Sequence, residues 1–448
     1  MMQALSKHVF YPLWDLKEGA QRLSELKRLN VTQYWPAERV RTLQLERLSS
    51  IVRYATDNCA YYTQRYRSEG FDGVVRTLDD LQRIPMVSKR DIRENADAFI
   101  SKQFTKSQLF EARTGGSTGK ALIVHFDKAC QEYRNAAAMR TDSWAGRDLG
   151  TKTMALWGNP PVDESLKDRI RGTLLNRLLY LDTMGLNDSS VREFISTWRR
   201  ERPRVIFGHS HSIYVLARLV QEQGVDDIRP AGIISTSMML LDKERAVIEQ
   251  VFRCPVSNRY GCEEVGLIAA ECPEHRGMHT NWEHVIVECL RPDGTPAAPG
   301  EEGEVVVTDL LNQGMPLIRY RVEDVAVPSD RVCSCGRTAP LLERVVGRVA
   351  DFLIKVDGTL VAGVSLVERT LTKFPGVDQM RLIQESLHHL VVQVVPGAGY
   401  TPESQSGLME ELTQVFGKDV KLDLQVLQAL PQETSGKYRF AICKVARP

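Results

Sequence analysis

A run of eight residues combines glycines, hydroxyl side chains and a lysine, the residue types that bind phosphate groups. The run reads Arg113-Thr114-Gly115-Gly116-Ser117-Thr118-Gly119-Lys120. Glycines permit positive φ angles and a close backbone approach to a ligand, while backbone N–H groups, hydroxyls and a lysine can bind phosphate oxygens. It is not a Walker A loop, because Ala121 and not Ser or Thr follows the lysine. The run therefore predicts a phosphate-binding loop of another kind, with a polar turn as the alternative.

Two further blocks carry acids that could bind the rest of a nucleotide. The first, Tyr260-Gly261-Cys262-Glu263-Glu264, follows a predicted strand. A carboxylate beside a triphosphate is a suitable magnesium ligand, although an exposed acidic turn would have the same composition. The second block runs from Thr308 to Asp324. An aspartate at a strand end here could accept both hydroxyls of a ribose, or it could pair with Arg319 or Arg321.

A lysine near the C-terminus follows a short flexible turn. The segment reads Leu430-Pro431-Gln432-Glu433-Thr434-Ser435-Gly436-Lys437. A lysine on such a turn can enter a site as a point charge. It would stabilise the charge that develops between a carboxylate and an α-phosphate. The alternative for Lys437 is an ordinary exposed lysine.

Soft metal ligands occur in two separate segments. Cys272 and His279 lie close together in the sequence, and Cys333 and Cys335 follow much later, next to a glycine. Two thiols and a Cys/His pair could complete a tetrahedral zinc site. We predict the ligands Cys272, His279, Cys333 and Cys335, with His275 as the alternate histidine. Such a site would fix a loop and leave no open position for catalysis; free thiols and exposed histidines are the alternative.

The composition excludes several classes of protein. The chain has 448 residues, 43% of them hydrophobic, and a formal net charge of +1. At about 100–200 residues per domain, this length predicts two or three domains. Neither nucleic acid nor a membrane surface is indicated as a partner by that charge. No apolar run approaches the roughly 18 residues of a spanning helix, and no secretory signal is recognisable. Nine scattered cysteines indicate a reducing, cytoplasmic location.

The elements that must position these residues change in character along the chain. Up to about residue 97 the pattern is helical, with apolar residues at a 3.6-residue period from Val40 onward. Between about residues 109 and 346, short strands alternate with helices, which predicts a largely parallel sheet covered by helices, with ligands at the carboxyl ends of its strands. The clearest predicted strands are 205–208, 232–235 and 304–309, and the clearest helices are 213–223 and 243–252. The remaining residues carry an α+β pattern, so we predict domains at 1–346 and 347–448.

The order of these blocks resembles the signature motifs of the adenylate-forming superfamily, which includes acyl-CoA synthetases. Thr114 to Lys120, Tyr260 to Glu264, Thr308 to Asp324, Gly347 to Asp351 and Ser435 to Lys437 match five family blocks in order. The resemblance extends from about residue 40 to the end. It is closest to the phenylacetate–CoA ligase branch, including relatives from capsule and exopolysaccharide clusters. It implies an α/β fold with a large N-terminal domain and a small, mobile C-terminal lid domain.

The resemblance also implies an activity and residue roles. The activity is ATP-dependent adenylation of a carboxylic acid, with release of pyrophosphate, followed by acyl transfer. Glu264 would bind Mg²⁺, Asp324 the ribose and Lys437 would drive adenylation. The other nucleotide-binding residues would be Thr114, Gly115, Gly116, Ser117, Thr118, Gly119, Lys120, Tyr260, Gly261 and Arg348. Asp351 would be the hinge between the domains.

The chain departs from the family pattern at positions that bear on the acceptor. Glu323 precedes the ribose aspartate where the family has glycine, and Ala350 replaces the first of two hinge acids. The stretch after the hinge, 354–358, matches the family's thiol-binding glycines poorly. Coenzyme A is the default acceptor, with an amine or a carrier-protein thiol as alternatives. A non-catalytic nucleotide-binding homologue is the rival of another class.

The family pattern places the acid pocket near residues at predicted strand ends. These are Trp157, His209, Ser235 and Thr236. His209 and His211 could contact a polar acid or an incoming nucleophile, or each could be a hydrogen-bonded structural histidine. An aromatic acid is only a family expectation, and the sequence names no acid. It is silent on the oligomeric state, for which a homodimer stays open.

Overall fold

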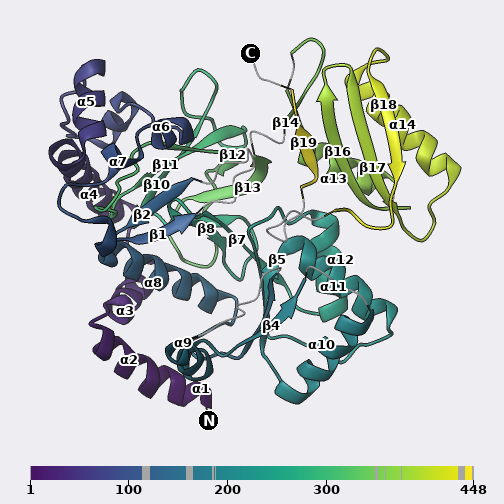
Figure 1. Cartoon of the computed structure of the whole chain (residues 1–448), viewed down its shortest axis with the longest axis horizontal. Helices are drawn as coiled ribbons and strands as arrows, with labels where there is room; N and C mark the ends of the chain where they lie inside the picture. Colours follow the sequence, from purple (N-terminus) through teal and green to yellow (C-terminus); the bar gives the residue numbers. More distant parts are fainter. Residues whose placement is uncertain are drawn as a thin grey trace.

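The computed structural model describes residues 2–113, 122–157, 165–183, 186, 188–348, 352–358, 360–374, 376–431 and 439–445. It has helices packed on a large mixed sheet, followed by a smaller C-terminal α+β unit (Figure 1). This architecture confirms the α/β fold that the alternating pattern predicts. Among the described helices, none combines the length and the apolar character needed to cross a bilayer.

The N-terminal region is helical, as its periodicity predicts. Its main helices are α2 (Tyr11–Glu18), α3 (Arg22–Thr32), α4 (Ala37–Asn58), α5 (Ala60–Glu69), α6 (Lys89–Glu94) and α7 (Ala96–Phe99). In α4 the buried residues Val40, Leu48, Ile51, Val52 and Ala55 recur at helical spacing. Bonds to much later residues hold these helices in place: Thr32 donates to Glu283 and Tyr62 to the carbonyl oxygen of Pro316.

One sheet of eleven strands forms the centre of the large domain. Its order is β10-β11-β12-β13-β9-β8-β7-β6-β5-β3-β4. The parallel part consists of β3 (Thr153–Trp157), β4 (Leu178–Asp182), β5 (Val205–His209), β6 (Gly232–Thr236) and β7 (Val256–Cys262). Strands β3, β5 and β6 are almost entirely buried because helices cover both faces of this part of the sheet. Those helices are α8 (Lys128–Trp144), α10 (Asp188–Glu201), α11 (Ser210–Glu222) and α12 (Asp242–Phe252).

The antiparallel part of the sheet curls. It contains β8 (Gly266–Glu271), β9 (Met278–Thr280), β10 (Val285–Leu290), β11 (Gly303–Asp309), β12 (Tyr320–Ser329) and β13 (Leu341–Arg348). β13, β9 and β8 lie between β12 and β7 in the sheet order, yet side chains of β12 and β7 are hydrogen-bonded to each other. The curl therefore brings together two strands that a flat sheet would hold far apart.

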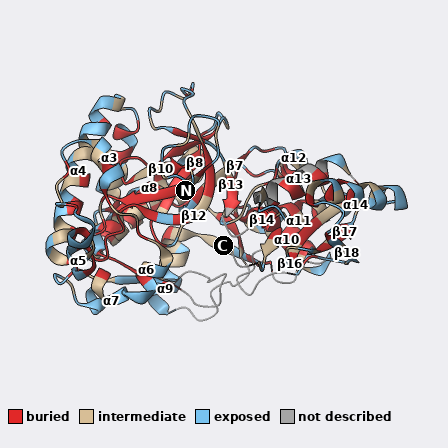
Figure 2. Ribbon diagram, turned by 90° about the horizontal axis from the view of Figure 1, so that it is seen from above, coloured by how far each residue is buried: buried red, intermediate tan, exposed pale blue. Residues whose placement is uncertain are grey.

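The C-terminal unit has its own sheet and hydrophobic core. The sheet order is β18-β17-β16-β19, with β16 (Val377–Ser386), β17 (His389–Pro396), β18 (Lys421–Val426) and β19 (Ala441–Cys443). Helices α13 (Gly363–Lys373) and α14 (Pro402–Phe416) accompany it, and the short strands β14 (Phe352–Ile354) and β15 (Leu360–Ala362) form a hairpin. Buried residues follow the strands of both sheets, whereas α5 and α14 expose their outer sides (Figure 2). β13 ends at Arg348, so the boundary predicted between residues 346 and 347 falls inside that strand.

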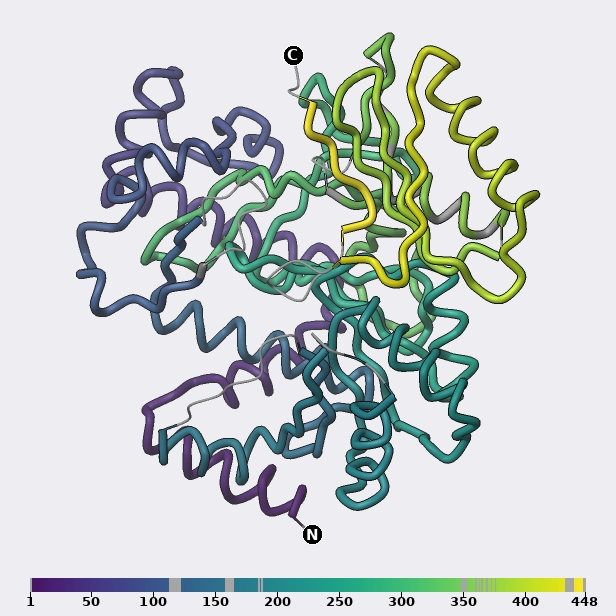
Figure 3. The backbone as a smooth tube through the Cα atoms, turned by 45° about the vertical axis from the view of Figure 1, so that its right-hand side comes forward, coloured from purple at the N-terminus to yellow at the C-terminus, as the bar shows by residue number. Residues whose placement is uncertain are grey.

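The C-terminal unit lies against α11 and α12 of the large domain (Figure 3). Leu241, just before α12, belongs to the C-terminal hydrophobic core. Tyr214 on α11 donates to Asp378 on β16 at 2.9 Å, and Arg218 forms an ion pair with the same carboxylate. Lys243 donates to the carbonyl oxygens of Val377 and Asp378. Polar and apolar contacts thus fix one orientation of the small domain.

Candidate active site

Several predicted site residues fall outside the described part of the chain. These are the phosphate-loop residues 114–120, the hinge residue Asp351 and Lys437. The strands that flank the predicted loop are described: β1 (Phe110–Arg113) and β2 (Ile123–Phe126) pair antiparallel. The backbone of Arg348 is described as the last residue of β13.

Glu264 lies in the turn between β7 and β8, and Asp324 lies on β12. Tyr320 donates to Oε1 of Glu264 at 2.8 Å, and Tyr260 donates to Oδ2 of Asp324 at 2.9 Å. Burial raises the pKa of both phenols well above the usual range, so both stay protonated donors. Two hydrogen bonds therefore connect the segment that carries Glu264, the predicted Mg²⁺ ligand, with the segment that carries Asp324, the residue predicted to bind the ribose.

A bulge in β12 sets the position of Asp324. Across β11, Glu304 pairs with Val325 and Val306 with Arg321, so extra residues on β12 bulge out between these pairs. Within the bulge Glu323 has φ +68°, the left-handed region that glycine adopts most readily. Asp324 then pairs across β13 with Arg348. The backbone thereby places two predicted nucleotide-binding residues on adjacent strands.

Gly261 is required by a close approach of two strands. A Cβ atom at this position would lie 2.5 Å from the carbonyl oxygen of Gly266. The glycine thus allows the tight β7–β8 hairpin whose turn carries Glu264. Steric crowding in this hairpin therefore explains why glycine occupies position 261.

The arginines of the second block pair with glutamates. Arg319 forms two hydrogen bonds with Glu288, and Arg321 forms two with Glu304. The other aspartate of the block, Asp309, is fully buried beside His284, whose Nε2 lies 3.1 Å from Oδ1. The side-chain ion pairs described for Arg319 and Arg321 are thus with glutamates.

Three of the predicted pocket residues lie together at the carboxyl ends of parallel strands. Trp157 ends β3, His209 ends β5 and Thr236 ends β6. The rings of Trp157 and His209 have centroids 4.3 Å apart, and His209 pairs with Thr236 across the sheet. Ser235 is different: neighbouring residues of a strand point to opposite faces, and Ser235 is buried with its Oγ 3.1 Å from Oδ1 of Asn258.

His211, considered above as a second histidine for the pocket, is a buried structural residue in this arrangement. Its Nδ1 contacts the carboxylate of Glu244, and both side chains are almost completely buried. The ring lies between Tyr214 and Phe440. His211 therefore links α11 and α12 beneath the C-terminal domain.

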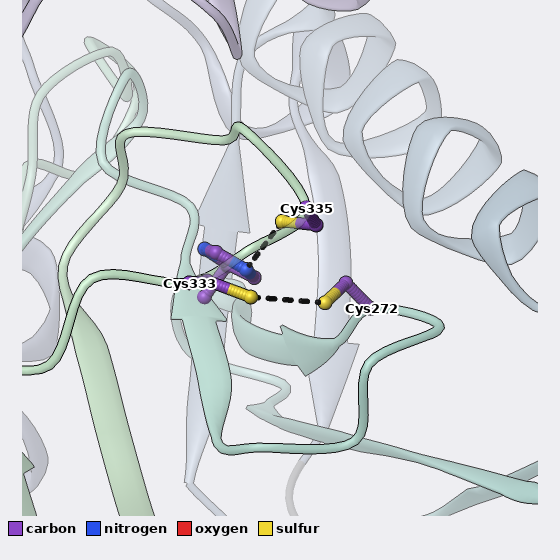
Figure 4. Close-up of side chains that lie close together, drawn as sticks. Cys272, Cys333 and Cys335 are labelled. Carbon is purple, nitrogen blue, oxygen red and sulfur yellow. Dashed lines mark hydrogen bonds between the residues drawn. The ribbon is translucent and has the colours of Figure 1, made fainter.

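The four predicted metal ligands converge. The ligand atoms of Cys272, His279, Cys333 and Cys335 all lie within 4.8 Å of one another. Figure 4 shows the three cysteines pointing toward one centre. The sulfur atoms of Cys272 and Cys333 are 3.6 Å apart, and Nε2 of His279 is 3.3 Å from the sulfur of Cys335. These separations suit ligands around a zinc ion with Zn–S bonds of about 2.3 Å and Zn–N bonds of about 2.0 Å.

The surroundings of His279 favour a metal-binding tautomer. Its Nδ1 lies 3.3 Å from the carbonyl oxygen of Ala339, which can accept a hydrogen bond from a protonated Nδ1 and thereby favours the tautomer with Nε2 unprotonated. Burial lowers the pKa of this histidine to about 4. The alternate ligand, His275, instead lies with Nδ1 3.5 Å from a carboxylate oxygen of Glu271. The geometry thus favours His279.

Two groups of buried residues escaped the sequence reasoning. One is the pair of tyrosines that bond the two acids, of which only Tyr260 was predicted, and as a nucleotide-binding residue. The repeated spacing was a signal for this pair, because Tyr260 precedes Glu264 as Tyr320 precedes Asp324. The other is the cluster of Cys130, His284 and Asp309, whose ligand atoms also lie within 4.8 Å of one another. These three residues come from distant segments without a shared motif, so no sequence signal could have joined them.

Known proteins resemble the chain along most of its length. The family model described as the CapK C-terminal domain matches residues 353–444. Protein CapK of Staphylococcus aureus is 24% identical over 89% of this chain and 88% of its own length. A phenylacetate-coenzyme A ligase of Thermus thermophilus is 27% identical over 71% of this chain and 72% of its own length.

Among solved structures, 2-hydroxyisobutyryl-CoA ligase in its post-adenylation state superposes with a TM-score of 0.73 at 18% identity, covering 92% of this chain and 91% of that enzyme. The structural match confirms the predicted fold. Together with the sequence matches, it confirms the resemblance to adenylate-forming enzymes.

Proposed function

We propose that this protein is an ATP-dependent acid ligase, which joins a carboxylic acid to AMP, releases pyrophosphate and then transfers the acyl group. Coenzyme A is the default acceptor, and an amine or a carrier-protein thiol is the alternative. The observation that carries the proposal is the convergence of Glu264 and Asp324 inside a fold shared with an acyl-CoA ligase. This function accounts for two acids, on segments that the curl of the sheet brings together, each held by a tyrosine of the other segment.

In this proposal the chain's own residues bind and orient the nucleotide. Asp324 accepts the ribose hydroxyls, and Arg348, its neighbour on β13, contacts the nucleotide. Glu264 holds Mg²⁺, which neutralises phosphate charge when bound. The glycine-rich segment 114–120 binds phosphates through its backbone N–H groups. Lys437 stabilises the charge that forms as the carboxylate attacks the α-phosphate, and Asp351 is the hinge.

The acid is proposed to bind near Trp157, His209 and Thr236. Parallel strands in α/β sheets deliver ligand-binding residues at their carboxyl ends, where all three lie. The adjacent, tilted rings of Trp157 and His209 offer an aromatic wall, and the hydroxyl of Thr236 offers a polar contact. Ser235 would support this wall from the other face through Asn258.

A structural zinc ion is part of the proposal. Cys272, His279, Cys333 and Cys335 would hold it, since three thiols and one imidazole form a closed tetrahedral set. With no open position, the ion would fix the segment around residues 330–340 against β8 and β9 and take no part in acyl transfer. A cytoplasmic location belongs to the same proposal, because the reaction consumes ATP and these thiols must stay reduced.

The test is ATP-dependent pyrophosphate release with a panel of aryl, fatty, hydroxy and amino acids, with hydroxylamine present to trap acyl-AMP. We expect a selective response that Lys437→Ala and Glu264→Gln abolish. Lys444→Ala is the matched control, because Lys444 is an exposed lysine paired with Glu385, and it should leave the rate unchanged. A folded, ATP-binding protein that releases no pyrophosphate with any acid would favour the non-catalytic alternative.

Replacing hydroxylamine with coenzyme A, a primary amine or a carrier protein then identifies the acceptor. The proposal of coenzyme A predicts a thioester that forms only when the acid, ATP and coenzyme A are all present. An amide formed at a higher rate would assign the amine alternative.

A further inference from the structure

Two tyrosine–carboxylate hydrogen bonds cross between the same two segments. Segment 260–264 supplies Tyr260 as donor and Glu264 as acceptor, and segment 320–324 supplies Tyr320 as donor and Asp324 as acceptor. The tyrosine of each segment thus donates a hydrogen bond to the carboxylate of the other segment. The exchange links β12 to the β7–β8 turn, although three strands separate β12 from β7 in the sheet order.

Each bond restricts the acid that accepts it. A carboxylate has two oxygens, and a phenol bound to one of them fixes the direction in which the other points. Tyr320 engages Oε1 of Glu264 and Tyr260 engages Oδ2 of Asp324. Tyr320 is fully buried and Glu264 is only 4% exposed, so water competes little for this bond. A hydrogen bond to a charged group is stronger than one between neutral groups.

We infer that Tyr260 and Tyr320 are positioning residues that hold Asp324 and Glu264 as one unit, so that ribose recognition and Mg²⁺ binding are coupled. The inference rests on the proposed function of the two acids. In this role the phenol oxygens act through the carboxylates that they hold. Because both bonds join the same two segments, loss of either one weakens the connection that holds both acids in place.

The coupling has a consequence that a purely structural role would not produce. A tyrosine that only stabilised the fold would, when replaced, weaken the binding of every nucleotide equally. If a tyrosine orients Asp324, its replacement must instead reduce the preference for ATP over 2′-deoxy-ATP. If a tyrosine orients Glu264, its replacement must raise the Mg²⁺ concentration needed for half-maximal ATP binding. Because the two acids are coupled, each substitution should change both the preference for ATP and the Mg²⁺ concentration needed for half-maximal binding.

The experiment measures equilibrium binding of ATP and 2′-deoxy-ATP by calorimetry across a Mg²⁺ titration, using Tyr260→Phe, Tyr320→Phe and the double variant of the full chain. The matched control is Tyr62→Phe, which removes a fully buried phenol that donates to the carbonyl oxygen of Pro316. We expect each active-site variant to reduce the ATP preference and to raise the half-maximal Mg²⁺ concentration, each by about tenfold, which corresponds to about 1.4 kcal/mol. The double variant should lose little more than either single variant.

Several results would overturn the inference. The first is that both phenylalanine variants keep the ATP preference and the Mg²⁺ dependence within about twofold of Tyr62→Phe, since about twofold is less than 0.5 kcal/mol. The second is that effects multiply in the double variant, which would show independent roles. Because binding needs no acid substrate, a protein that binds ATP but adenylates nothing would contradict the proposed function and still test this inference.

Discussion

Lys89 forms an ion pair with Glu323, the residue that stands directly before Asp324. Its Nζ lies 3.0 Å from Oε2 of Glu323 and 3.0 Å from the carbonyl oxygen of Val322. Lys89 begins α6, in the N-terminal helical region, so a distant helix holds the bulge of β12. Glu323 occupies a left-handed conformation that costs a non-glycine residue about 1–2 kcal/mol. The ion pair offsets part of this strain at position 323.

Substitutions at Glu323 should separate the two effects. Glu323→Gly removes the strain together with a half-exposed ion pair worth about 0–1 kcal/mol, so unfolding free energy should change by less than about 1 kcal/mol. Glu323→Ala keeps the strain and loses the pair, so it should be less stable than Glu323→Gly by about 1 kcal/mol. Chemical denaturation measures both. An alanine variant as stable as the glycine variant would contradict the strain at this position.

Loss of the cysteine cluster should remove a metal ion. Purified protein should contain about one zinc per chain, and Cys335→Ser should lose it and melt about 4 °C lower or more, the shift that about 2 kcal/mol produces in a domain of 150–250 residues. Cys443→Ser is the control, because Cys443 is a half-buried thiol beside Gln384, outside the cluster. Metal analysis with thermal unfolding decides the matter, and wild-type protein with far less than one zinc would refute the site.

Removing one charge from the buried pair of Arg140 and Glu283 should lower the free energy of unfolding more than removing one charge from a more exposed pair. Arg140 is 2% exposed, Glu283 is fully buried, and Thr32 donates to the same carboxylate. Glu283→Gln leaves the arginine buried without its charge partner and should cost about 3–5 kcal/mol. Glu25→Gln, in a half-exposed pair with Arg28, should cost less than about 1 kcal/mol. Equal costs in denaturant titrations would contradict this ranking.

The same pair predicts a pH dependence with a defined sign. Burial alone would raise the pKa of Glu283, but Arg140 outweighs it and the pKa is lowered. A carboxylate with a lowered folded pKa stabilises the protein above its unfolded pKa of about 4.3, and this contribution is lost as pH falls through the folded value. Below about pH 4 the wild type should therefore lose unfolding free energy faster than Glu283→Gln. Denaturant titrations between pH 7 and pH 3 compare the two slopes, and parallel curves would exclude the pair as a cause.

Asp378→Asn should loosen the small domain from α11. The substitution weakens bonds from Tyr214 and Arg218 to a mostly buried carboxylate, each worth about 1.5–3 kcal/mol when charged. Hydrogen exchange of α11 and the start of β16 should accelerate by about tenfold or more. Asp423→Asn, which alters an exposed pair with His389 and Lys421 within the small domain, should leave α11 unchanged. Unchanged exchange in Asp378→Asn would show that apolar contacts alone hold the domain.

The local elements could be predicted because their patterns are local. β6 is a short apolar run covered on both faces, and α4 repeats its apolar residues at helical spacing. The convergence of Cys272, His279, Cys333 and Cys335 was predictable from residue types, since two segments supply a complete set of zinc-binding side chains. Strand alternation likewise predicts that the side chains of Ser235 and Thr236 point to opposite faces of β6.

Other features depend on contacts that no local pattern encodes. The crossed bonds of Tyr260 and Tyr320 require the curl of the sheet, which arises from pairings made far apart in the chain. Lys89 reaches Glu323 only because α6 packs against β12. Asp378 finds its partners on α11 only through the orientation of the small domain. Tertiary packing decides each of these contacts, so a reading of separate segments could not reach them.

The bonds that hold the N-terminal helices also set an order of events during synthesis. Glu283, the partner of Thr32, is synthesised 251 residues later, and Pro316, the partner of Tyr62, is synthesised 254 residues later. At about 5–20 residues per second, these partners leave the ribosome roughly 12–50 s after the helices do. The part of α4 that packs against the later strands therefore lacks these partners throughout that interval, so some apolar surface of the helix stays exposed until the sheet forms.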